Sequence, residues 1–403
     1  MTVMVGAFRL VSAMLGLLAW GCAPTAIPAP GGSPEAKTPL RFQFIYMIHG
    51  DAGYTFHDRN GVRHSADADA VEQAVLVARS SPAAEVYIFH QKPVKALGVV
   101  RRSDATMLFY RGGALIERRG YRREAEDVEF KAEAALYHAL SAAPDAGIVR
   151  TFAWFGHEIP VTSDLPYSRS RPDKGFTIAA FAKGLERFGG STGPGGKPFA
   201  IILLSSCHGG TPEATSAILP YAAYLVAAPG EVHLSYLDAR ALSRMAETPA
   251  ASFWLAQSED WARTIAAESF ARLQKVTSTD IRLSLYESPK ASAWLEAHRE
   301  AWVRDPRDDG EAPENRAAME ARDCALVPGF GPGGAEAGVT VFQQAPKFGP
   351  DKSRSIGSGW ECRVPIGSPV QFTEPAPTIE PAGAPAVQNP PLKSAPVAAS
   401  DPY

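Results

Sequence analysis

The chain has 403 residues, a formal net charge of −3 and a hydrophobic content of 45%. Its 40 basic and 43 acidic side chains nearly cancel, which argues against a protein that binds nucleic acid through a basic face. The length accommodates one large domain with appendages, and the hydrophobic content suffices for a sizeable core.

Residues 1–22 are typical of a bacterial export signal. Arg9 precedes an apolar stretch that ends at Trp20, and Gly21 and Cys22 follow. The stretch is short for a membrane-spanning helix but matches the apolar region of a signal peptide. A small residue followed by cysteine resembles a bacterial lipobox, although Trp20 stands where a small residue is usual. This resemblance implies lipidation of Cys22, and an ordinary signal peptide with an incidental cysteine is the alternative.

The composition divides the rest of the chain into four segments. Residues 23–40 are rich in Pro, Ala and Gly without an apolar face, which is typical of a flexible tether. Residues 41–303 form the predicted folded domain, and residues 304–370 form a loop-rich accessory region. Residues 371–403 are a Pro/Ala-rich tail that we expect to be disordered. We therefore expect an exported protein of the cell envelope, held to the membrane by its N-terminal lipid alone.

Four cysteines occur in the sequence. Cys324 and Cys362 lie in the core-poor accessory region, where a disulfide stabilises most, and they are the disulfide candidates. If Cys22 carries lipid, Cys207 remains as the odd thiol of an exported chain.

Strands and helices alternate along the predicted domain in the manner of βα units. The predicted strands are 42–50, 85–90, 147–157, 199–206 and 279–287, with a hairpin over 107–119 that turns at Gly112 and Gly113. The predicted helices are 67–80, 125–142, 176–190, 238–247, 251–275 and 288–303. The run "FAIILLSS" at 199–206 lacks polar alternation, as expected for a strand covered by helices on both faces. The pattern predicts an α/β fold with a mostly parallel central sheet.

Two reactive side chains follow strands of this sheet. His157 ends "FAWFGH", and Cys207 follows "FAIILLSS" after a single intervening helix. A strand–helix–strand crossover places both at the carboxyl edge of the sheet, where α/β proteins gather functional groups. An imidazole beside a thiol can accept its proton and later deliver it to a leaving amine. After the cysteine, Thr211 and Pro212 predict the N-cap and first residue of a helix.

Residues 41–290 resemble the clostripain family of cysteine peptidases, which share the caspase–gingipain fold. The blocks that carry the resemblance are "FIYMIHGDAGY", "FAWFGHE" and "FAIILLSSCHGGTPEATSAILPYAAYLVAAPGEV". The resemblance implies a caspase-like three-layer αβα sandwich and hydrolysis of peptide bonds. It implies that His157 is the general base and acid, that Cys207 is the nucleophile, and that the backbone amides of Glu158 and Cys207 hold the oxyanion. It implies no cofactor; relatives can depend on calcium, but no acidic loop here demands that ion.

Two residues depart from the family pattern. Glu158 stands where relatives usually have glycine, and Ser205 stands where relatives tend to carry the aspartate of a pocket for Arg or Lys side chains. A neutral serine does not neutralise a guanidinium, so the preference for basic residues does not carry over. Ser205, Ser206 and His208 remain candidates for the substrate pocket.

The other histidines have simpler interpretations. His49 ends a strand and is expected to be a packed structural residue. A zinc site formed by His157, Cys207 and His208 lacks the usual ligand spacing, so no metal is expected. We expect a monomer whose partner is a peptide or protein substrate.

Two other functions remain open. In the first, a degenerate peptidase fold on a lipoprotein binds a peptide or protein without cleaving it, which Glu158 and Ser205 favour. In the second, "SSCHG" is the nucleophile turn of an α/β-hydrolase. That fold requires an acid and then a histidine after the nucleophile, whereas His157 precedes Cys207.

Overall fold

The computed structural model describes the central part of the chain. The described residues are 40–51, 53–57, 62–93, 96–97, 100–101, 104–124, 127–141, 148–161, 165–189, 196–230, 240–247, 254–277, 280–299, 337–345, 347 and 360. All of them belong to one compact unit, Pro39–Tyr403. The expectations for the signal segment, the tail, Cys22, Cys324 and Cys362 fall outside the described residues.

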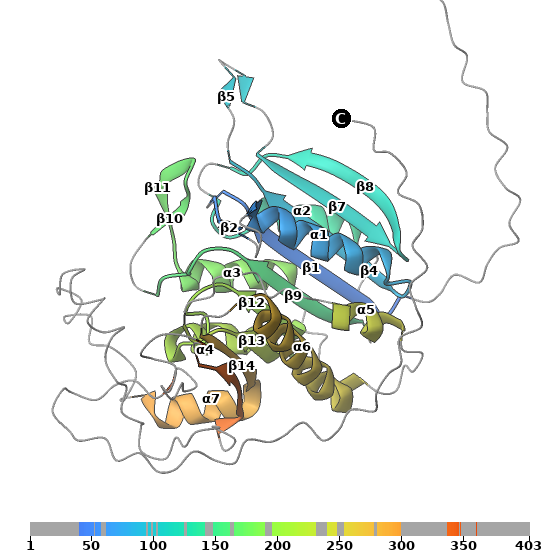
Figure 1. Cartoon of the computed structure of the whole chain (residues 1–403). Helices are drawn as coiled ribbons and strands as arrows, with labels where there is room; N and C mark the ends of the chain where they lie inside the picture. Colours follow the sequence, from blue (N-terminus) through green and yellow to red (C-terminus); the bar gives the residue numbers. More distant parts are fainter. Residues whose placement is uncertain are drawn as a thin grey trace, which may run out of the picture. The chain divides into compact units, whose positions relative to one another are not determined.

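The described part of the chain contains a sheet of nine strands. They are β1 (Phe42–His49), β4 (Ala84–Gln91), β7 (Ala105–Arg111), β8 (Ala114–Tyr121), β9 (Val149–Phe155), β12 (Phe199–Ser205), β13 (Ala222–Ala227), β14 (Ile281–Glu287) and β15 (Val339–Gln344). Their order is β15-β14-β13-β12-β9-β1-β4-β7-β8 (Figure 1). The five strands β13, β12, β9, β1 and β4 run parallel to one another. On one flank β14 pairs antiparallel with β13 and β15 with β14, and on the other flank β7 pairs antiparallel with β4 and β8 with β7. Three short hairpins accompany the sheet: β2 (Thr55–His57) with β3 (Arg63–Ser65), β5 (Ala96–Leu97) with β6 (Val100–Arg101), and β10 (Leu165–Ser168) with β11 (Arg171–Phe176).

Helices cover both faces of this sheet. They are α1 (Ala66–Arg79), α2 (Lys131–Leu140), α3 (Ile178–Phe188), α4 (Pro212–Ile218), α5 (Arg240–Glu247), α6 (Trp254–Val276) and α7 (Ser288–Ala297), with a short 3₁₀ helix, η2 (Leu219–Tyr221). Alternate residues of β1 face opposite layers, as the period of a strand requires. Phe44 and Tyr46 belong to the apolar cluster that includes α1, α5 and α6, whereas Ile45 and Met47 belong to the cluster that includes α2, α3, α4 and α7. The predicted three-layer α/β fold with a parallel centre is confirmed.

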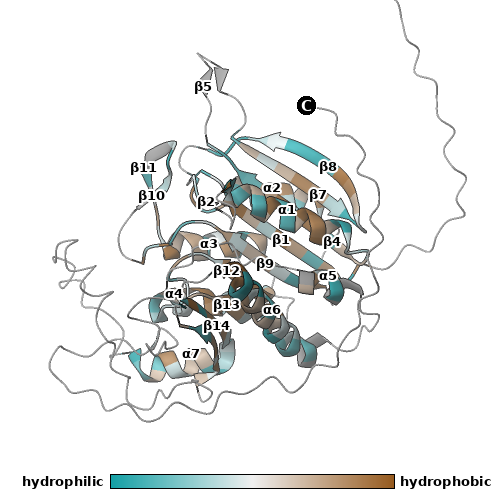
Figure 2. Ribbon diagram, viewed as in Figure 1, coloured by the Kyte–Doolittle hydropathy of each residue, from teal (hydrophilic) through white to brown (hydrophobic). Residues whose placement is uncertain are grey.

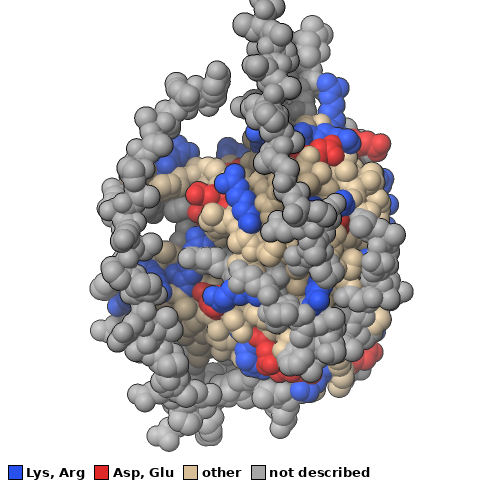
Figure 3. Space-filling model, turned by 90° about the vertical axis from the view of Figure 1, so that its right-hand side faces the viewer, with Lys and Arg blue, Asp and Glu red and all other residues tan. Residues whose placement is uncertain are grey.

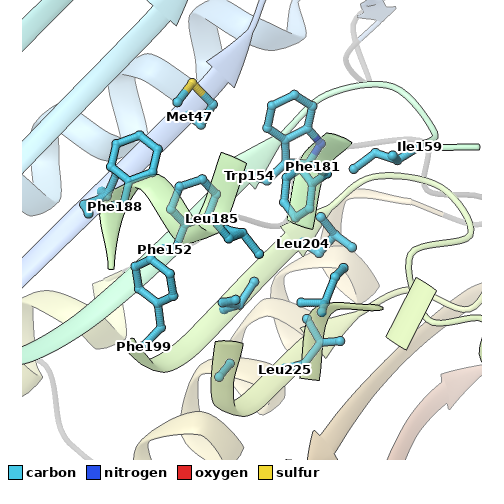
Figure 4. Packing of buried hydrophobic residues seen from close by; sticks show 14 of the residues in the cluster. Met47, Phe152, Trp154, Ile159, Phe181, Leu185, Phe188, Phe199, Leu204 and Leu225 are labelled. Atoms are coloured by element: carbon cyan, nitrogen blue, oxygen red, sulfur yellow. The ribbon is translucent and has the colours of Figure 1, made fainter. Parts of the chain in front are cut away.

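The strand β12 is buried along its whole length. Figure 2 shows the central strands as predominantly hydrophobic, with hydrophilic residues gathered on helix faces and on β8. The rings of Phe181 and Phe188 on α3 pack with those of Phe152 on β9 and Phe199 on β12 (Figure 4). The centroid of the Phe152 ring is 5.6 Å from that of Phe188 and 5.6 Å from that of Phe199. The apolar run that predicted a central strand therefore forms the middle of a closely packed core.

The region 304–370 differs from the expectation of a loop-rich appendage. β15 lies inside this region and pairs antiparallel with β14, which makes it an edge strand of the main sheet. Trp360 is also buried and stacks on Tyr286 of β14 at 5.2 Å. The unit built around the sheet thus extends beyond residue 303. Besides its pairing with β14, β15 packs on α6 through Phe342, whose ring lies 6.0 Å from that of Phe270.

The predicted hairpin is confirmed at its turn. Gly112 and Gly113 join β7 to β8 with φ of +60° and +84°. These left-handed values suit glycine, and two in succession match the twist of a tight hairpin.

Basic and acidic side chains are interspersed over the face displayed in Figure 3. Several charged residues in the described part of the chain form exposed ion pairs, such as Arg263 with Glu259 one helical turn apart, at 3.0 Å. Exposed pairs of this kind contribute little to stability, so the fold depends on its two apolar layers.

Candidate active site

The register of two central strands determines where His157 and Cys207, the predicted catalytic dyad, lie. β9 and β12 are adjacent and parallel, and their last paired residues are Phe155 and Ser205. The backbone N–H of Gly156 donates to the carbonyl oxygen of Ser205 at 3.3 Å, which continues the pairing past the strands. His157 and Cys207 each follow two residues after the paired positions. Neighbouring strands are about 4.8 Å apart, so the two backbones emerge side by side at the carboxyl edge.

A tight turn positions Cys207, which is a half-buried thiol. The backbone N–H of His208 donates to Gly230 O at 2.9 Å, and that of Gly210 donates to Ala228 O at 2.8 Å. His208 has a φ of +54°, a left-handed conformation that is uncommon for a residue with a side chain. The turn is thereby fixed to the segment that follows β13.

Close packing explains the glycine at the end of this turn. A Cβ atom at Gly210 would lie 2.5 Å from the Tyr286 hydroxyl and 2.9 Å from the backbone nitrogen of Pro229. The carbonyl oxygen of Gly210 accepts hydrogen bonds from Tyr286 OH at 2.8 Å and from Trp360 Nε1 at 3.0 Å. The helix predicted after the turn is also present, because Thr211 Oγ1 accepts from Ala214 N at 3.3 Å at the start of α4.

The ring of His157 is held by a tyrosine. Tyr54, which precedes β2, places its hydroxyl 2.9 Å from His157 Nδ1, and the two rings are 4.7 Å apart. His157 is exposed on one side, but the neighbouring protein removes water from the other. This desolvation lowers the pKa of His157 below its ordinary value, and the nearby Glu158 carboxylate acts in the opposite direction. The imidazole is therefore biased toward its neutral form, which can accept a proton.

The other predicted site residues differ in their exposure. Ser205 and Ser206 are buried, with 3% and 2% of their surfaces exposed, whereas Glu158 and His208 are half-buried. Within the described residues, no hydrogen-bond partner lies near Ser206 Oγ. Ser205 and Ser206 therefore do not contribute to the exposed surface beside Cys207 in this structure. Their role in a substrate pocket stays a prediction.

A small aromatic cavity lies beside His157. It is lined by His49, Trp154, His157, Glu158, Pro160, Tyr167 and Phe176. His49 is buried, its Nε2 is 3.2 Å from Ser168 Oγ, and its ring stacks on Tyr167 at 4.5 Å. Burial lowers the pKa of His49 to about 3, and the positive charge of Arg123 acts in the same direction. His49 is thus a neutral, packed histidine, as the sequence predicts.

An acidic residue anchors the hairpin that borders this cavity. Asp51 is buried, its carboxylate accepts from Ser170 N at 3.2 Å and from the Ser170 hydroxyl, and its carbonyl oxygen accepts from Arg169 N at 2.9 Å. These bonds join the loop after β1 to the turn between β10 and β11. Sequence reasoning missed both this hairpin and Tyr54. The only signal for Tyr54 is its place at the end of "FIYMIHGDAGY", because its partner lies 103 residues away.

The described residues contain no cluster of three histidine, cysteine, aspartate or glutamate side chains that could hold a metal ion. Among the helices in this part of the chain, none is both long and apolar enough to cross a membrane.

Solved structures similar to this chain include secreted proteases. One is a secreted C11 cysteine protease from Bacteroides thetaiotaomicron in complex with an irreversible peptide inhibitor, with a TM-score of 0.43 and 11% identity over 65% of this chain and 70% of that one. Another is an inactive zymogen C11 protease from Parabacteroides distasonis, with a TM-score of 0.40 and 14% identity over 68% of each chain. A third, called iotapain and also from Bacteroides thetaiotaomicron, has a TM-score of 0.42 and 11% identity over 67% of this chain and 73% of that one.

These three structures are clostripain-like cysteine proteases, the class that the sequence motifs resemble. At such identities and TM-scores the likeness carries no argument about individual residues. No protein-family profile matches the sequence. No curated protein matches it either.

Proposed function

We propose that this protein is a cysteine endopeptidase that hydrolyses peptide bonds with His157 and Cys207. The observation that supports the proposal most strongly is the register of β9 and β12, because it ends both strands side by side immediately before the two residues. A buried core cysteine would not require a histidine at the same height on the neighbouring strand. The lowered pKa of His157 and the partial exposure of Cys207 also favour a reactive pair.

The proposed reaction proceeds in two halves. His157 takes the proton of the Cys207 thiol, and the thiolate attacks the carbonyl carbon of the scissile bond. Backbone amides of Glu158 and Cys207 donate hydrogen bonds to the oxyanion, and one such donor contributes roughly 3 kcal/mol to transition-state stabilisation. The imidazolium then gives its proton to the leaving amine, which leaves a thioester on Cys207. Water, deprotonated by His157, hydrolyses the thioester and restores the thiol.

The substrate follows from the residues around the pair. Ser205 stands where the family's basic pocket tends to carry an aspartate, and it has no charge, while Glu158 is the carboxylate among the residues that line the cavity beside His157. A neutral serine gives no charge compensation to a buried guanidinium or ammonium group. We therefore propose that the enzyme does not require a basic residue before the cleaved bond.

Variants of the pair test this function. We expect Cys207→Ala and His157→Ala each to reduce cleavage of an unfolded protein substrate by about 10⁴-fold or more, with folding intact. His138→Ala is the matched control, since His138 is an exposed histidine of α2 bonded to the backbone of Arg187. Cleavage by each purified variant is measured across a peptide panel with varied side chains, and folding is checked by thermal unfolding.

Two outcomes would contradict the proposal. Cleavage that persists in Cys207→Ala would assign the activity to another residue or to a contaminant. A folded wild-type chain that cleaves nothing in the panel would favour the alternative function, a protein that binds peptides through the same sheet edge.

We also propose that the mature chain is held at the cell envelope by a lipid on Cys22. The expected result is that Cys22→Ser moves the protein from the membrane pellet to the soluble fraction of the producing cells. If the variant stays in the pellet, the anchor is not a lipid on this residue.

A further inference from the structure

Two contacts hold Tyr54 in place beside the candidate active site. Its carbonyl oxygen accepts a hydrogen bond from Ala66 N at 3.1 Å, which joins its backbone to the start of α1. Its ring packs edge-on against Phe155, with centroids 6.5 Å apart and an interplanar angle of 65°. Phe155 is the last residue of the strand that leads to His157. The tyrosine and the histidine are therefore positioned by the same end of β9.

The contact with His157 engages one ring nitrogen only. The Tyr54 hydroxyl lies 2.9 Å from Nδ1, so Nε2 is the other nitrogen available for proton transfer. Asp51, the acidic residue of the same loop, uses its carboxylate on the amide and hydroxyl of Ser170. In this loop, the residue that bonds the His157 imidazole is thus the neutral phenol of Tyr54 and not the Asp51 carboxylate.

We propose that Tyr54 is the positioning residue of the catalytic histidine, and that its hydroxyl accepts a hydrogen bond from Nδ1–H so that Nε2 exchanges the proton with Cys207. This inference rests on the proposed function. In the resting pair, Nδ1 carries the proton and the lone pair of Nε2 is free. On activation the S–H bond of Cys207 breaks and the Nε2–H bond forms, which leaves a thiolate and an imidazolium. The Nε2 proton later passes to the leaving amine.

The strength of the Tyr54 hydrogen bond changes during this cycle. The bond from Nδ1–H to the phenol oxygen is a neutral interaction in the resting pair and becomes charge-assisted once the imidazolium forms. Hydrogen bonds that involve a charged group are roughly twice as strong as neutral ones, so Tyr54 favours the ion pair over the neutral pair. The titratable groups around the ring are Tyr54 itself, Glu158, His49 across the cavity, and Cys207 at the end of the neighbouring strand.

Two substitutions separate the hydroxyl from the ring. Tyr54→Phe keeps the packing on Phe155 and His157 but removes the acceptor, whereas Tyr54→Leu removes both. Tyr221→Phe is the matched control, because the Tyr221 hydroxyl donates to Glu186 at 2.6 Å in another part of the molecule. All variants are made in the full chain.

The first measurement follows Cys207 without any substrate. The rate at which iodoacetamide alkylates Cys207 is measured against pH, and the modified residue is identified by peptide mass mapping. We expect Tyr54→Phe to slow alkylation about tenfold or more at pH 6 and to move the midpoint of the profile to higher pH, with Tyr54→Leu similar and Tyr221→Phe unchanged. A Tyr54→Phe profile equal to that of the wild type, with only Tyr54→Leu impaired, would overturn the proposal, because the ring and not the hydroxyl would then be responsible.

The second measurement tests the tyrosine–histidine contact independently of the cysteine. Nitrogen NMR of histidine-labelled protein reports which ring nitrogen carries the proton, and the His157 signals are assigned by their loss in His157→Gln. We expect the neutral ring to be protonated at Nδ1 in the wild type and to lose this preference in Tyr54→Phe. Identical His157 spectra in the two proteins would overturn the proposal even if Cys207 is a nucleophile. If His157→Ala leaves Cys207 alkylation unchanged, the dyad itself fails, whatever the NMR shows.

Discussion

The two ends of the parallel strands use polar side chains in opposite ways. At the amino end of β1, Gln43 is completely buried, and all four hydrogen-bonding positions of its amide are occupied. Nε2 donates to Glu85 Oε2 and to Ser141 Oγ, each at 2.8 Å. Oε1 accepts from Tyr137 OH at 2.8 Å and from Arg150 Nε at 2.9 Å. The Gln43 amide is thus fully satisfied within a buried polar network at this end of the sheet, although Thr151 Oγ1, near the start of β9, has no partner among the described residues.

At the carboxyl end of the strands, polar side chains are accessible to solvent or have hydrogen-bonding groups that are not all used. His157 is exposed and Cys207 is half-buried. Among the described residues, the buried Ser206 Oγ and Trp154 Nε1 have no hydrogen-bond partner. His208 also adopts its left-handed backbone conformation at this edge.

Buried polar residues therefore do not by themselves mark a functional site. A fully connected network rigidifies the fold, because each group already has its partner. A site requires groups that are held in place and can still exchange a proton or a hydrogen bond with a bound molecule. By this criterion the amino end is structural and the carboxyl end is the candidate site.

Among the substitutions that distinguish the two ends of the sheet, we expect the largest change in the free energy of unfolding at Gln43. Its replacement by alanine removes one partner from each of several buried groups, and each such loss costs about 1–3 kcal/mol. We expect Gln43→Ala to lower the free energy of unfolding by about 3–5 kcal/mol while Cys207 reactivity in the folded fraction stays unchanged. Urea unfolding measures the first quantity. Gln343→Ala, at an exposed glutamine of β15, is the control and should change stability by less than about 0.5 kcal/mol. If Gln43→Ala is as stable as this control, the network does not stabilise the fold.

A second, smaller effect concerns His49, at the opposite end of the same strand. Its pKa is about 3 in the folded protein and about 6.5 when unfolded, so the unfolded state binds more protons between these values. The free energy of unfolding therefore falls as the pH decreases below about 6.5, by about 1.4 kcal/mol for each pH unit. We expect His49→Gln to lose less stability than the wild type between pH 7.5 and pH 5, by about 2 kcal/mol. Urea unfolding at both pH values provides the measurement. His138→Gln is the control, and equal acid sensitivity in His49→Gln and the wild type would show that His49 is not buried in neutral form.

The smallest effect is expected at Glu158. Its carboxylate raises the pKa of His157, against the stronger lowering by desolvation. Glu158→Gln removes the raising contribution, so the pKa of His157 falls further. We expect the limb of the pH–rate profile that titrates with His157 to move to lower pH, with little change in the maximal rate. Glu72→Gln, at an exposed glutamate of α1, should leave the profile in place. A shift to higher pH would contradict the assigned electrostatics.

Much of the fold follows from local pattern. The uninterrupted apolar run of β12 predicts a central strand, and the Thr211–Pro212 pair predicts the start of α4, because both signals lie within the element that they specify. The edge at which His157 and Cys207 emerge follows from the strand–helix–strand order. Gly112 and Gly113 likewise identify the hairpin turn, because the two glycines lie within the turn itself.

Other features depend on partners that are distant in the sequence. β15 pairs with the edge of β14, and the sequence of β15 does not indicate which strand is its partner. The bonds from Asp51 to Ser170 and from Tyr54 to His157 each span more than 100 residues, so the sequence does not indicate which side chain of the loop meets the histidine. The partners of Gln43 are similarly dispersed, which hides the difference between the closed and the open end of the sheet.

The most direct test of the central claim is covalent labelling of the folded wild-type chain. A panel of peptidyl acyloxymethyl ketones with varied side chains reacts selectively with an activated cysteine, and mass spectrometry identifies the labelled residue. We expect a single adduct on Cys207 that disappears in His157→Ala. An unlabelled Cys207 across the whole panel, or equal labelling with and without His157, would contradict that claim.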